Sequence, residues 1–231
     1  MLFREFDQRS LTLERLDTGD YTPQEYSKWL REMRVINRFL GDNRCLQLEL
    51  DQLLGRSDGK KISILDVGAG SGELLEFAGA ASGKNAGLLV GAELNTDAAK
   101  AINTRSTVSA VQCDALNLPF GDGSFDMVIS SLFLHHLNDG DAVRLISEMA
   151  RVARLRFVLI DLHRHPAAYY MYKTFGPLAF QEFTIEDGSL SIKRSFRPDE
   201  LRSIALKAGV KDPVVKRRAA FRLVLTGRMD V

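Results

Sequence analysis

Three glycines lie between a short apolar run and a segment with helical character. Ile62 to Val67 predicts a buried strand, Gly68, Gly70 and Gly72 a tight turn, and Glu73 the start of a helix. A buried strand, a glycine turn and a helix in this order are typical of a nucleotide-binding loop in a parallel sheet. Glycine permits the dihedral angles and the close backbone approach that a side chain would block. We therefore expect this loop to bind a nucleotide-like cofactor.

The spacing of the glycines argues against a dinucleotide. The fingerprint G-x-G-x-x-G would need its third glycine where Glu73 stands. A carboxylate at that point would repel a pyrophosphate by roughly a few kcal/mol in a partly desolvated site. A cofactor that has positive charge and no phosphate is favoured instead, and S-adenosylmethionine, with its sulfonium and ammonium groups, fits that description.

An acidic residue follows the second predicted strand, Ala86 to Ala92. Glu93 lies about 20 positions after the glycine loop, where dinucleotide-type folds place the acid that binds a ribose. A carboxylate has the paired acceptor oxygens that a vicinal diol needs. The alternative is a carboxylate that only caps the helix predicted over Asn95 to Thr104. Under the ribose hypothesis, Leu94 would pack on the adenine ring.

The segment Asp66-Val67-Gly68-Ala69-Gly70-Ser71-Gly72 resembles the first motif of class I S-adenosylmethionine-dependent methyltransferases. The resemblance implies that this segment lines the methionine part of the cofactor, and that Asp114 and Ala115 bind the adenine. We add Ser131, at the end of the fourth predicted strand, to the cofactor contacts. A second stretch, Leu118 to Asp126, is similar to the L-P-F-x-D-x-S-F-D stretch of the ubiquinone/menaquinone-biosynthesis branch of the family.

Two neighbouring histidines follow the fourth predicted strand, Phe125 to Ser131. His135 and His136 should reach the carboxyl edge of the sheet, where Asp161 ends the fifth strand. Methyl transfer to a hydroxyl needs a general base with a pKa near the working pH, and histidine suits that role. A carboxylate beside the base orients it. Resemblance to sugar and natural-product O-methyltransferases implies His135 as base and Asp161 as its partner.

Other assignments stay open at this edge. The base could be His136, or else His163 or His165, because all four histidines of the chain lie between positions 135 and 165. Relatives that methylate amino groups carry Asn/Asp-Pro-Pro-aromatic after the fourth strand, and this chain has Ser130-Ser131-Leu132-Phe133 there. A metal-assisted reaction would want a carboxylate at the same point. We therefore predict hydroxyl methylation and no metal site.

The remaining pattern predicts an α/β fold with a Rossmann-like, seven-stranded methyltransferase sheet, mostly parallel with an antiparallel C-terminal strand. Residues 1–57 are expected to form an N-terminal helical lid, with helices over Pro23 to Leu40 and Cys45 to Leu54. Residues 58–231 would form the cofactor-binding domain. Its insert, 162–196, is predicted to hold an aromatic-rich helix followed by an irregular cap over Phe183 to Phe196.

Composition limits the classes of function. The chain has 231 residues, 45% of them hydrophobic, and a net charge of +1, which predicts one α/β unit with no overall attraction to nucleic acid or membrane. Cys45 and Cys113 predict reduced thiols, and we expect a cytoplasmic protein. Its partner would be a small-molecule substrate, with a homodimer left open.

Two other functions remain as alternatives. One is a cofactor-binding partner subunit that has lost methyl transfer. The other is an RNA or protein methyltransferase recruited by the basic C-terminal tail (Lys211, Lys216, Arg217, Arg218, Arg222 and Arg228). The simpler explanation, which we prefer, is that these basic residues protect a solvated edge strand from pairing with another chain.

Overall fold

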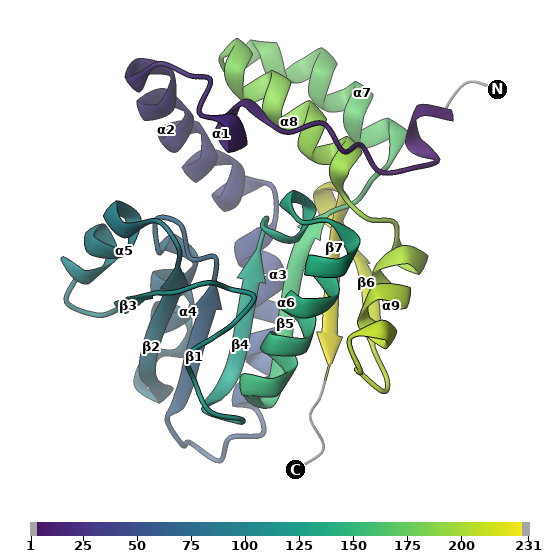
Figure 1. The fold of residues 1–231 in the computed structure, drawn as a ribbon. Helices are drawn as coiled ribbons and strands as arrows, with labels where there is room; N and C mark the ends of the chain where they lie inside the picture. Colours follow the sequence, from purple (N-terminus) through teal and green to yellow (C-terminus); the bar gives the residue numbers. More distant parts are fainter. Residues whose placement is uncertain (1–3, 228–231) are drawn as a thin grey trace.

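The computed structural model describes residues 4–227, except for the side chains of Arg38 and Phe39. A seven-stranded sheet with the order β3-β2-β1-β4-β5-β7-β6 forms its centre (Figure 1). Every neighbouring pair is parallel except those made by β7, which runs antiparallel to β5 and β6. The predicted fold class is confirmed. The strands are β1 Ile62–Val67, β2 Ala86–Glu93, β3 Ser109–Gln112, β4 Phe125–Ser131, β5 Ala153–Leu162, β6 Val214–Arg218 and β7 Arg222–Gly227. The predicted end of the last strand, Arg228, lies outside the described residues.

Helices cover both faces of the sheet, so the central strands are buried on two sides and read as continuous apolar runs. Helices α3 (Asp42–Leu54), α4 (Glu73–Ser82) and α5 (Thr96–Asn103) pack on one face, and α6 (Asp139–Val152) and α9 (Pro198–Lys207) on the other. Two apolar clusters result, one on each side of the sheet. This rigid frame fixes where the strands end and the functional loops begin.

A second layer lies above the carboxyl ends of the parallel strands (Figure 1). It consists of α1 (Arg15–Thr18), α2 (Pro23–Phe39), α7 (Pro166–Phe175) and α8 (Glu182–Arg194), with its own small apolar cluster around Phe6 and Tyr169. The predicted start of α2 is confirmed by a capping box between Thr22 and Glu25. Short 3-10 turns complete the chain: η1 Arg4–Phe6, η2 Gly83–Asn85, η3 Leu134–His136, η4 Gly176–Leu178 and η5 Ala219–Phe221.

The prediction of an irregular cap over Phe183 to Phe196 was wrong, because α8 fills most of that segment. The segment contains Gly188 and several serines, which are weak helix formers, so its sequence did not predict a helix. Tertiary packing overrides that weakness. A Cβ at Gly188 would lie 2.5 Å from the hydroxyl of Tyr172, and the Ser191 and Ser195 hydroxyls donate to carbonyls one turn back.

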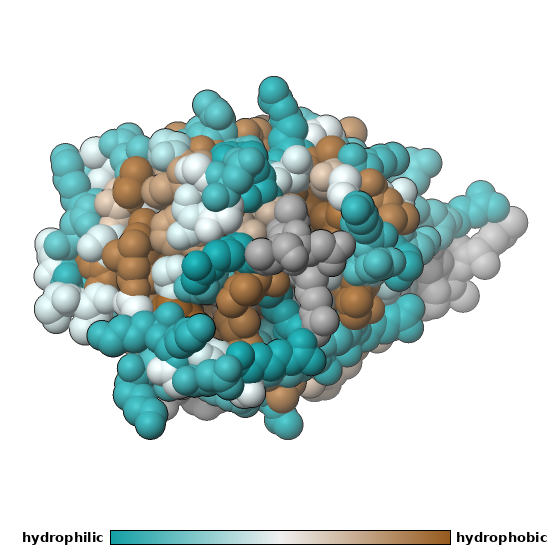
Figure 2. Space-filling model, turned by 90° about the horizontal axis from the view of Figure 1, so that it is seen from below, coloured by the Kyte–Doolittle hydropathy of each residue, from teal (hydrophilic) through white to brown (hydrophobic). Residues whose placement is uncertain are grey.

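The two N-terminal helices occupy different layers. Helix α2 contacts α8 above the sheet, whereas α3 packs against α4 and β5 beside it. The domain division at residue 57 stays a prediction, and α3 contributes Leu46 and Leu50 to the apolar cluster on the α4 face. The opposite end of the molecule, seen from below in Figure 2, presents hydrophilic residues interspersed with hydrophobic ones.

Candidate functional site

A cavity of about 500 Å³ separates the carboxyl edge of the sheet from the layer above it. Its wall is mostly apolar and aromatic, and it reaches Gly68 of the glycine loop and both residues of the histidine pair. The aromatic-rich helix supplies part of that wall through Tyr172 and Phe175. Tyr169 instead packs in the upper layer, with its ring centroid 5.4 Å from that of Phe6.

The glycine loop adopts the backbone that its sequence predicts. Gly68, Gly70 and Gly72 have φ angles of 73°, 52° and 75°, which residues with a side chain rarely adopt. A Cβ at Gly68 would lie 2.9 Å from the ring of Phe133, so this glycine also makes room for a neighbour. The amides of Gly68 and Ala69 donate to the carbonyl of Ala92 at 2.9 and 3.2 Å. The loop is therefore fastened to the end of β2.

Glu93 joins the glycine loop to the start of α5. Its carboxylate accepts from the amide of Gly70 at 2.8 Å and from the amide of Asn95 at 2.9 Å. The cap of α5 is Asn95, whose side chain accepts from two helix amides, so Glu93 is not the helix cap. Leu94 beside it is 68% exposed and offers an apolar face to a ligand.

Two further carboxylates belong to the predicted cofactor set. Asp114 is exposed, and its side chain accepts from the amide of Leu116 at 2.9 Å. Asp66 is buried at the end of β1, and burial followed by the negative charge of Glu93 raises its pKa to about 8. A cationic ligand group nearby would relieve that unfavourable charge. Ala115 and Ser131 are half-buried at the ends of their segments.

The structure brings His135 and Asp161 together in a buried pair. Nδ1 of His135 lies 2.7 Å from Oδ1 of Asp161, and the His135 amide donates to Oδ2 at 2.9 Å. Burial raises the pKa of Asp161, but the charge and hydrogen bond of His135 outweigh it, so the pKa of this carboxyl is lowered. An ionised Asp161 accepts a hydrogen bond from Nδ1–H of His135, and this tautomer leaves the ring's lone pair on Nε2.

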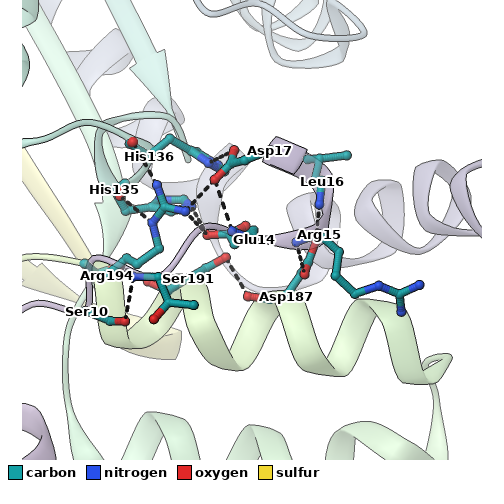
Figure 3. Close-up of polar contacts among 12 residues, drawn as sticks. Ser10, Glu14, Arg15, Leu16, Asp17, His135, His136, Asp187, Ser191 and Arg194 are labelled. Carbon is teal, nitrogen blue, oxygen red and sulfur yellow. Dashed lines mark hydrogen bonds and ion pairs between the residues drawn. The ribbon is translucent and has the colours of Figure 1, made fainter. Parts of the chain in front are cut away.

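His136 has a different carboxylate partner, from the N-terminal segment. Its Nδ1 lies 2.8 Å from Oδ1 of Asp17, and Arg194 pairs with the same carboxylate from α8 (Figure 3). Burial raises the pKa of Asp17, but His136 and Arg194 together lower it below its ordinary range. Arg194 also donates to the carbonyls of His135 and His136 at 3.2 and 2.8 Å. One guanidinium thus fixes the backbone of both histidines.

Glu14 completes this group and was not predicted from the sequence. It is 3% exposed, and its Oε1 lies 3.8 Å from Nε2 of His135 (Figure 3). That oxygen has no hydrogen-bond partner among the described residues. Burial, as the largest cause, raises the pKa of Glu14 to about 7. A buried polar atom without a partner at a cavity wall indicates a place for a ligand group.

The other two histidines have separate roles. His163 lines the cavity, but burial and the positive charge of His165 lower its pKa to about 4, so it is neutral near pH 7. The ring of His165 accepts from the amide of Ala167 and caps α7. Neither ring has a carboxylate within ion-pairing distance among residues 4–227.

Strained backbone gathers at the cavity. Leu132, Ala220 and Phe221 all have positive φ angles near 52–53° and all line it, whereas Asp58 is the one other such non-glycine residue in the described chain. Each conformation of this kind costs on the order of 1–3 kcal/mol and clusters at functional sites. Leu132 keeps its place because its amide donates to the carbonyl of Ile160 at 3.0 Å.

The segment that carries Glu14 and Asp17 is fastened at two points. Arg9 donates to the carbonyls of Leu137 and Arg194 at 2.8 and 2.6 Å, and its guanidinium lies 3.7 Å from the ring centroid of Phe196. Asp187 of α8 accepts from the amides of Arg15 and Leu16, both at 2.9 Å. The N-terminal segment is therefore a built wall of the site. The separation of these partners along the chain left no sequence pattern that could have revealed them.

Three residues of the basic C-terminal tail form ion pairs within the protein. Lys216 and Arg218 pair with the fully buried Glu49 at 3.0 and 3.4 Å, and Arg222 forms a bidentate pair with Asp42. Strand β6 lies at the edge of the sheet, as the charge pattern predicted. Charges held in internal pairs are not available to phosphates.

Comparison with known proteins agrees with this geometry. Residues 64–155 match the family described as "Methyltransferase domain". This match supports a class I S-adenosylmethionine-dependent methyltransferase domain in that part of the chain. An uncharacterized methyltransferase of Synechocystis sp. (strain PCC 6803) is 29% identical to this chain in an alignment of 170 residues, and the match covers 68% of this chain and 75% of the relative.

Solved structures of methyltransferases share the fold of this chain. The plantazolicin methyltransferase BpumL, in complex with a monoazolic desmethylPZN analog and SAH, has a TM-score of 0.69 at 14% identity, and the match covers 94% of this chain and 93% of BpumL. The magnesium protoporphyrin IX methyltransferase (ChlM) of Synechocystis PCC 6803, with bound SAH, has a TM-score of 0.63 at 16% identity, with 94% and 100% covered. Among residues 4–227, no helix is both long enough and apolar enough to cross a membrane.

Proposed function

We propose that this methyltransferase transfers the methyl group of S-adenosylmethionine to a hydroxyl of a small, largely apolar acceptor. The acceptor would lie in the cavity between the sheet edge and the upper layer. The observation that carries this proposal is the buried His135–Asp161 pair, whose histidine is one of the residues that line the cavity. A quinone-like, aromatic or polyketide-like acceptor would suit the apolar lining, in keeping with the resemblance of Leu118 to Asp126.

Positioning supplies much of the catalysis in this proposal. Methyl transfer from a sulfonium is an in-line displacement, so the acceptor oxygen must be held about 3–3.5 Å from the methyl carbon. The sulfonium leaves readily, and the remaining need is an acceptor oxygen without its proton. Nε2 of His135 accepts that proton, and the ionised Asp161 stabilises the imidazolium that forms.

The cofactor would lie along the neighbouring strand ends. We propose that Glu93 binds the ribose hydroxyls, because its carboxylate can accept further hydrogen bonds besides the two from backbone amides. We also propose that Leu94 packs on the adenine. Asp66 would face the positive methionine portion, because its buried carboxylate is otherwise unfavourable. The proposed cofactor contacts are Asp66, Gly68, Ala69, Gly70, Gly72, Glu93, Leu94, Asp114, Ala115 and Ser131.

Two measurements test the proposed function. Calorimetry with S-adenosylhomocysteine should give binding in the micromolar range, and NADH and NADPH should give none at the same concentrations. A screen of phenols, quinols and polyketides with radiolabelled S-adenosylmethionine should find acceptors whose label lies on oxygen. Label found only on nitrogen, or on RNA and protein in a crude extract but on no small molecule, would reject the hydroxyl acceptor.

A further inference from the structure

Glu14, His135 and His136 come from two distant parts of the chain and meet at one wall of the cavity. One carboxylate oxygen and one ring nitrogen from each histidine lie within 4.8 Å of one another. Zinc binds such oxygen and nitrogen donors at about 2.0–2.2 Å, so an ion between them would draw the three atoms roughly 1 Å closer. Two imidazoles and a carboxylate form a donor set that suits zinc and its neighbours among the divalent transition metals.

Each of the two histidine rings has a carboxylate partner at its Nδ1 atom. Nδ1 of His135 lies 2.7 Å from Asp161, and Nδ1 of His136 lies 2.8 Å from Asp17. A ligating histidine generally donates its other ring N–H to a carboxylate, which fixes the ring and raises its basicity as a ligand. The arrangement leaves Nε2 of His135 directed toward Glu14, 3.8 Å from Oε1.

Glu14 supplies an observation independent of the histidines. Its side chain is 4% exposed, and Oε1 has no hydrogen-bond partner among residues 4–227. Leaving a buried carboxylate oxygen without a partner costs on the order of 1–3 kcal/mol or more. A metal ion bound to that oxygen would remove the cost.

The surrounding charges leave room for a cation. Arg194 opposes one, with Nη1 3.8 Å from Oε1 of Glu14, but Asp17 and two histidine carbonyls already engage this guanidinium. Arg9 donates to the carbonyl of His135 and pairs with Asp139. Glu14, Asp17 and Asp161 around the rings outnumber Arg194, so the group carries a net negative charge when the three carboxylates are ionised.

We propose that Glu14, His135 and His136 bind one divalent transition-metal ion, zinc above all. The ion would occupy the lone pair of His135 Nε2 and so prevent it from accepting a proton. The site shares His135 with the proposed function but does not depend on methyl transfer taking place. It also differs from the sequence-based expectation of a metal-free site, which considered only the residues after β4.

Metal binding is tested directly on the full chain after treatment with a chelator. Titration with zinc in competition with a chromophoric chelator should give one site of micromolar affinity or tighter. His136→Ala and Glu14→Gln should each weaken it about tenfold or more, since each removes a ligand. The matched controls are His165→Ala, whose ring caps α7, and Glu186→Gln, whose side chain is exposed and pairs with Arg15.

A second measurement needs no variant. Cobalt(II) added to the wild-type protein should develop the strong visible absorption of a four-coordinate site with nitrogen ligands, and zinc should abolish it. Unchanged zinc affinity in His136→Ala, an equal loss in His165→Ala, or a cobalt spectrum identical to that of the aqueous ion would overturn the site. Binding of S-adenosylhomocysteine by each variant checks that the fold is intact.

Activity then separates this proposal from the proposed function. Zinc should inhibit methyl transfer in proportion to its occupancy of the site. Stimulation by zinc would overturn the claim that the bound ion prevents His135 from accepting a proton. If zinc fails to bind while His135→Ala still abolishes transfer, the metal site alone falls. If zinc binds as expected while His135→Ala transfers normally, the general base alone falls.

Discussion

The glycine loop after β1 and the histidine pair after β4 share one edge of the sheet, but the chain builds them differently. Glu93 reaches Gly70 across 23 positions, within one strand–helix–strand unit. Asp17 reaches His136 across 119 positions and Arg194 across 177. The glycine-loop side, where we propose that the cofactor binds, is thus a local structure. The histidine side, where we propose that the acceptor binds, depends on long-range contacts with the N-terminal segment and α8. Changes on the two sides should therefore affect different steps.

The largest expected effect is on the acceptor side. His135→Ala should lower the rate of methyl transfer about 10²-fold or more, because it removes the group that takes the acceptor proton. Calorimetry should find the affinity for S-adenosylhomocysteine unchanged, since the ring makes no contact with the glycine loop that the structure records. Asp161→Asn should also lower the rate, because a neutral partner stabilises the imidazolium less.

His165→Ala is the control for that comparison, because its ring caps α7 and is not part of the cavity wall. It should keep its transfer rate. A rate in His135→Ala equal to that of wild type would reject the base assignment, and a parallel loss of cofactor affinity would show that the two sides are not independent.

The next effect concerns the N-terminal segment. Asp187→Ala removes the carboxylate that accepts hydrogen bonds from the backbone amides of Arg15 and Leu16. Each of these charge-assisted hydrogen bonds is worth about 1.5–3 kcal/mol. The KM of the acceptor should rise roughly tenfold, because the wall that carries Glu14 loosens. Hydrogen exchange over residues 14–18 should accelerate while exchange in the sheet stays slow.

Glu186→Gln is the matched variant beside it, since Glu186 is exposed and pairs with the side chain of Arg15 rather than with its amide. Its KM should equal that of wild type. An unaltered exchange rate in Asp187→Ala would contradict the view that α8 holds this segment in place.

A third effect is the pH dependence of cofactor binding. Burial and Glu93 raise the pKa of Asp66 to about 8, so the free protein holds a proton there near neutrality. A cationic ligand favours the carboxylate and releases that proton. Affinity for S-adenosylmethionine should therefore rise with pH, by up to about tenfold per pH unit below about pH 8, and level off above it.

The same raised pKa has a consequence for the unliganded protein. Its carboxyl form is favoured in the folded state, so stability should fall as pH rises from about 4 through about 8. Asp66→Asn should flatten both the binding curve and the dependence of Tm on pH. A binding curve for Asp66→Asn with the same slope as wild type would assign the proton to another group.

The smallest effect is on stability, and it distinguishes backbone strain from steric crowding in the glycine loop. At Gly70 an added Cβ meets nothing within 4 Å, so Gly70→Ala should cost only the positive φ, about 1 kcal/mol of unfolding free energy. At Gly68 the added carbon also meets the ring of Phe133 at 2.9 Å. Chemical denaturation without cofactor should find Gly68→Ala less stable than Gly70→Ala, and a reversed order would contradict this packing.

Sequence patterns located the sheet, the glycine loop and the histidine–aspartate pair because each rests on a local signal. Strand runs, a glycine turn and the rule that parallel strands end at one edge need no knowledge of distant segments. The same reasoning failed at α8, where Gly188 lowers helix propensity but accommodates the Tyr172 ring. The single lid over residues 1–57 stays a prediction, and Leu46 and Leu50 of α3 belong to the cluster beside the sheet.

By itself the sequence determined a methyltransferase-type sheet, its glycine loop and the presence of His135 and Asp161 at one edge, because these follow from spacing along short stretches. Only the tertiary structure decided that Glu14, Asp17 and Arg194 surround the histidines. Burial and opposite charge stabilise these contacts, but the residues that make them lie far apart in the sequence and follow no regular spacing. Their positions therefore become visible only when the segments that carry them are packed together.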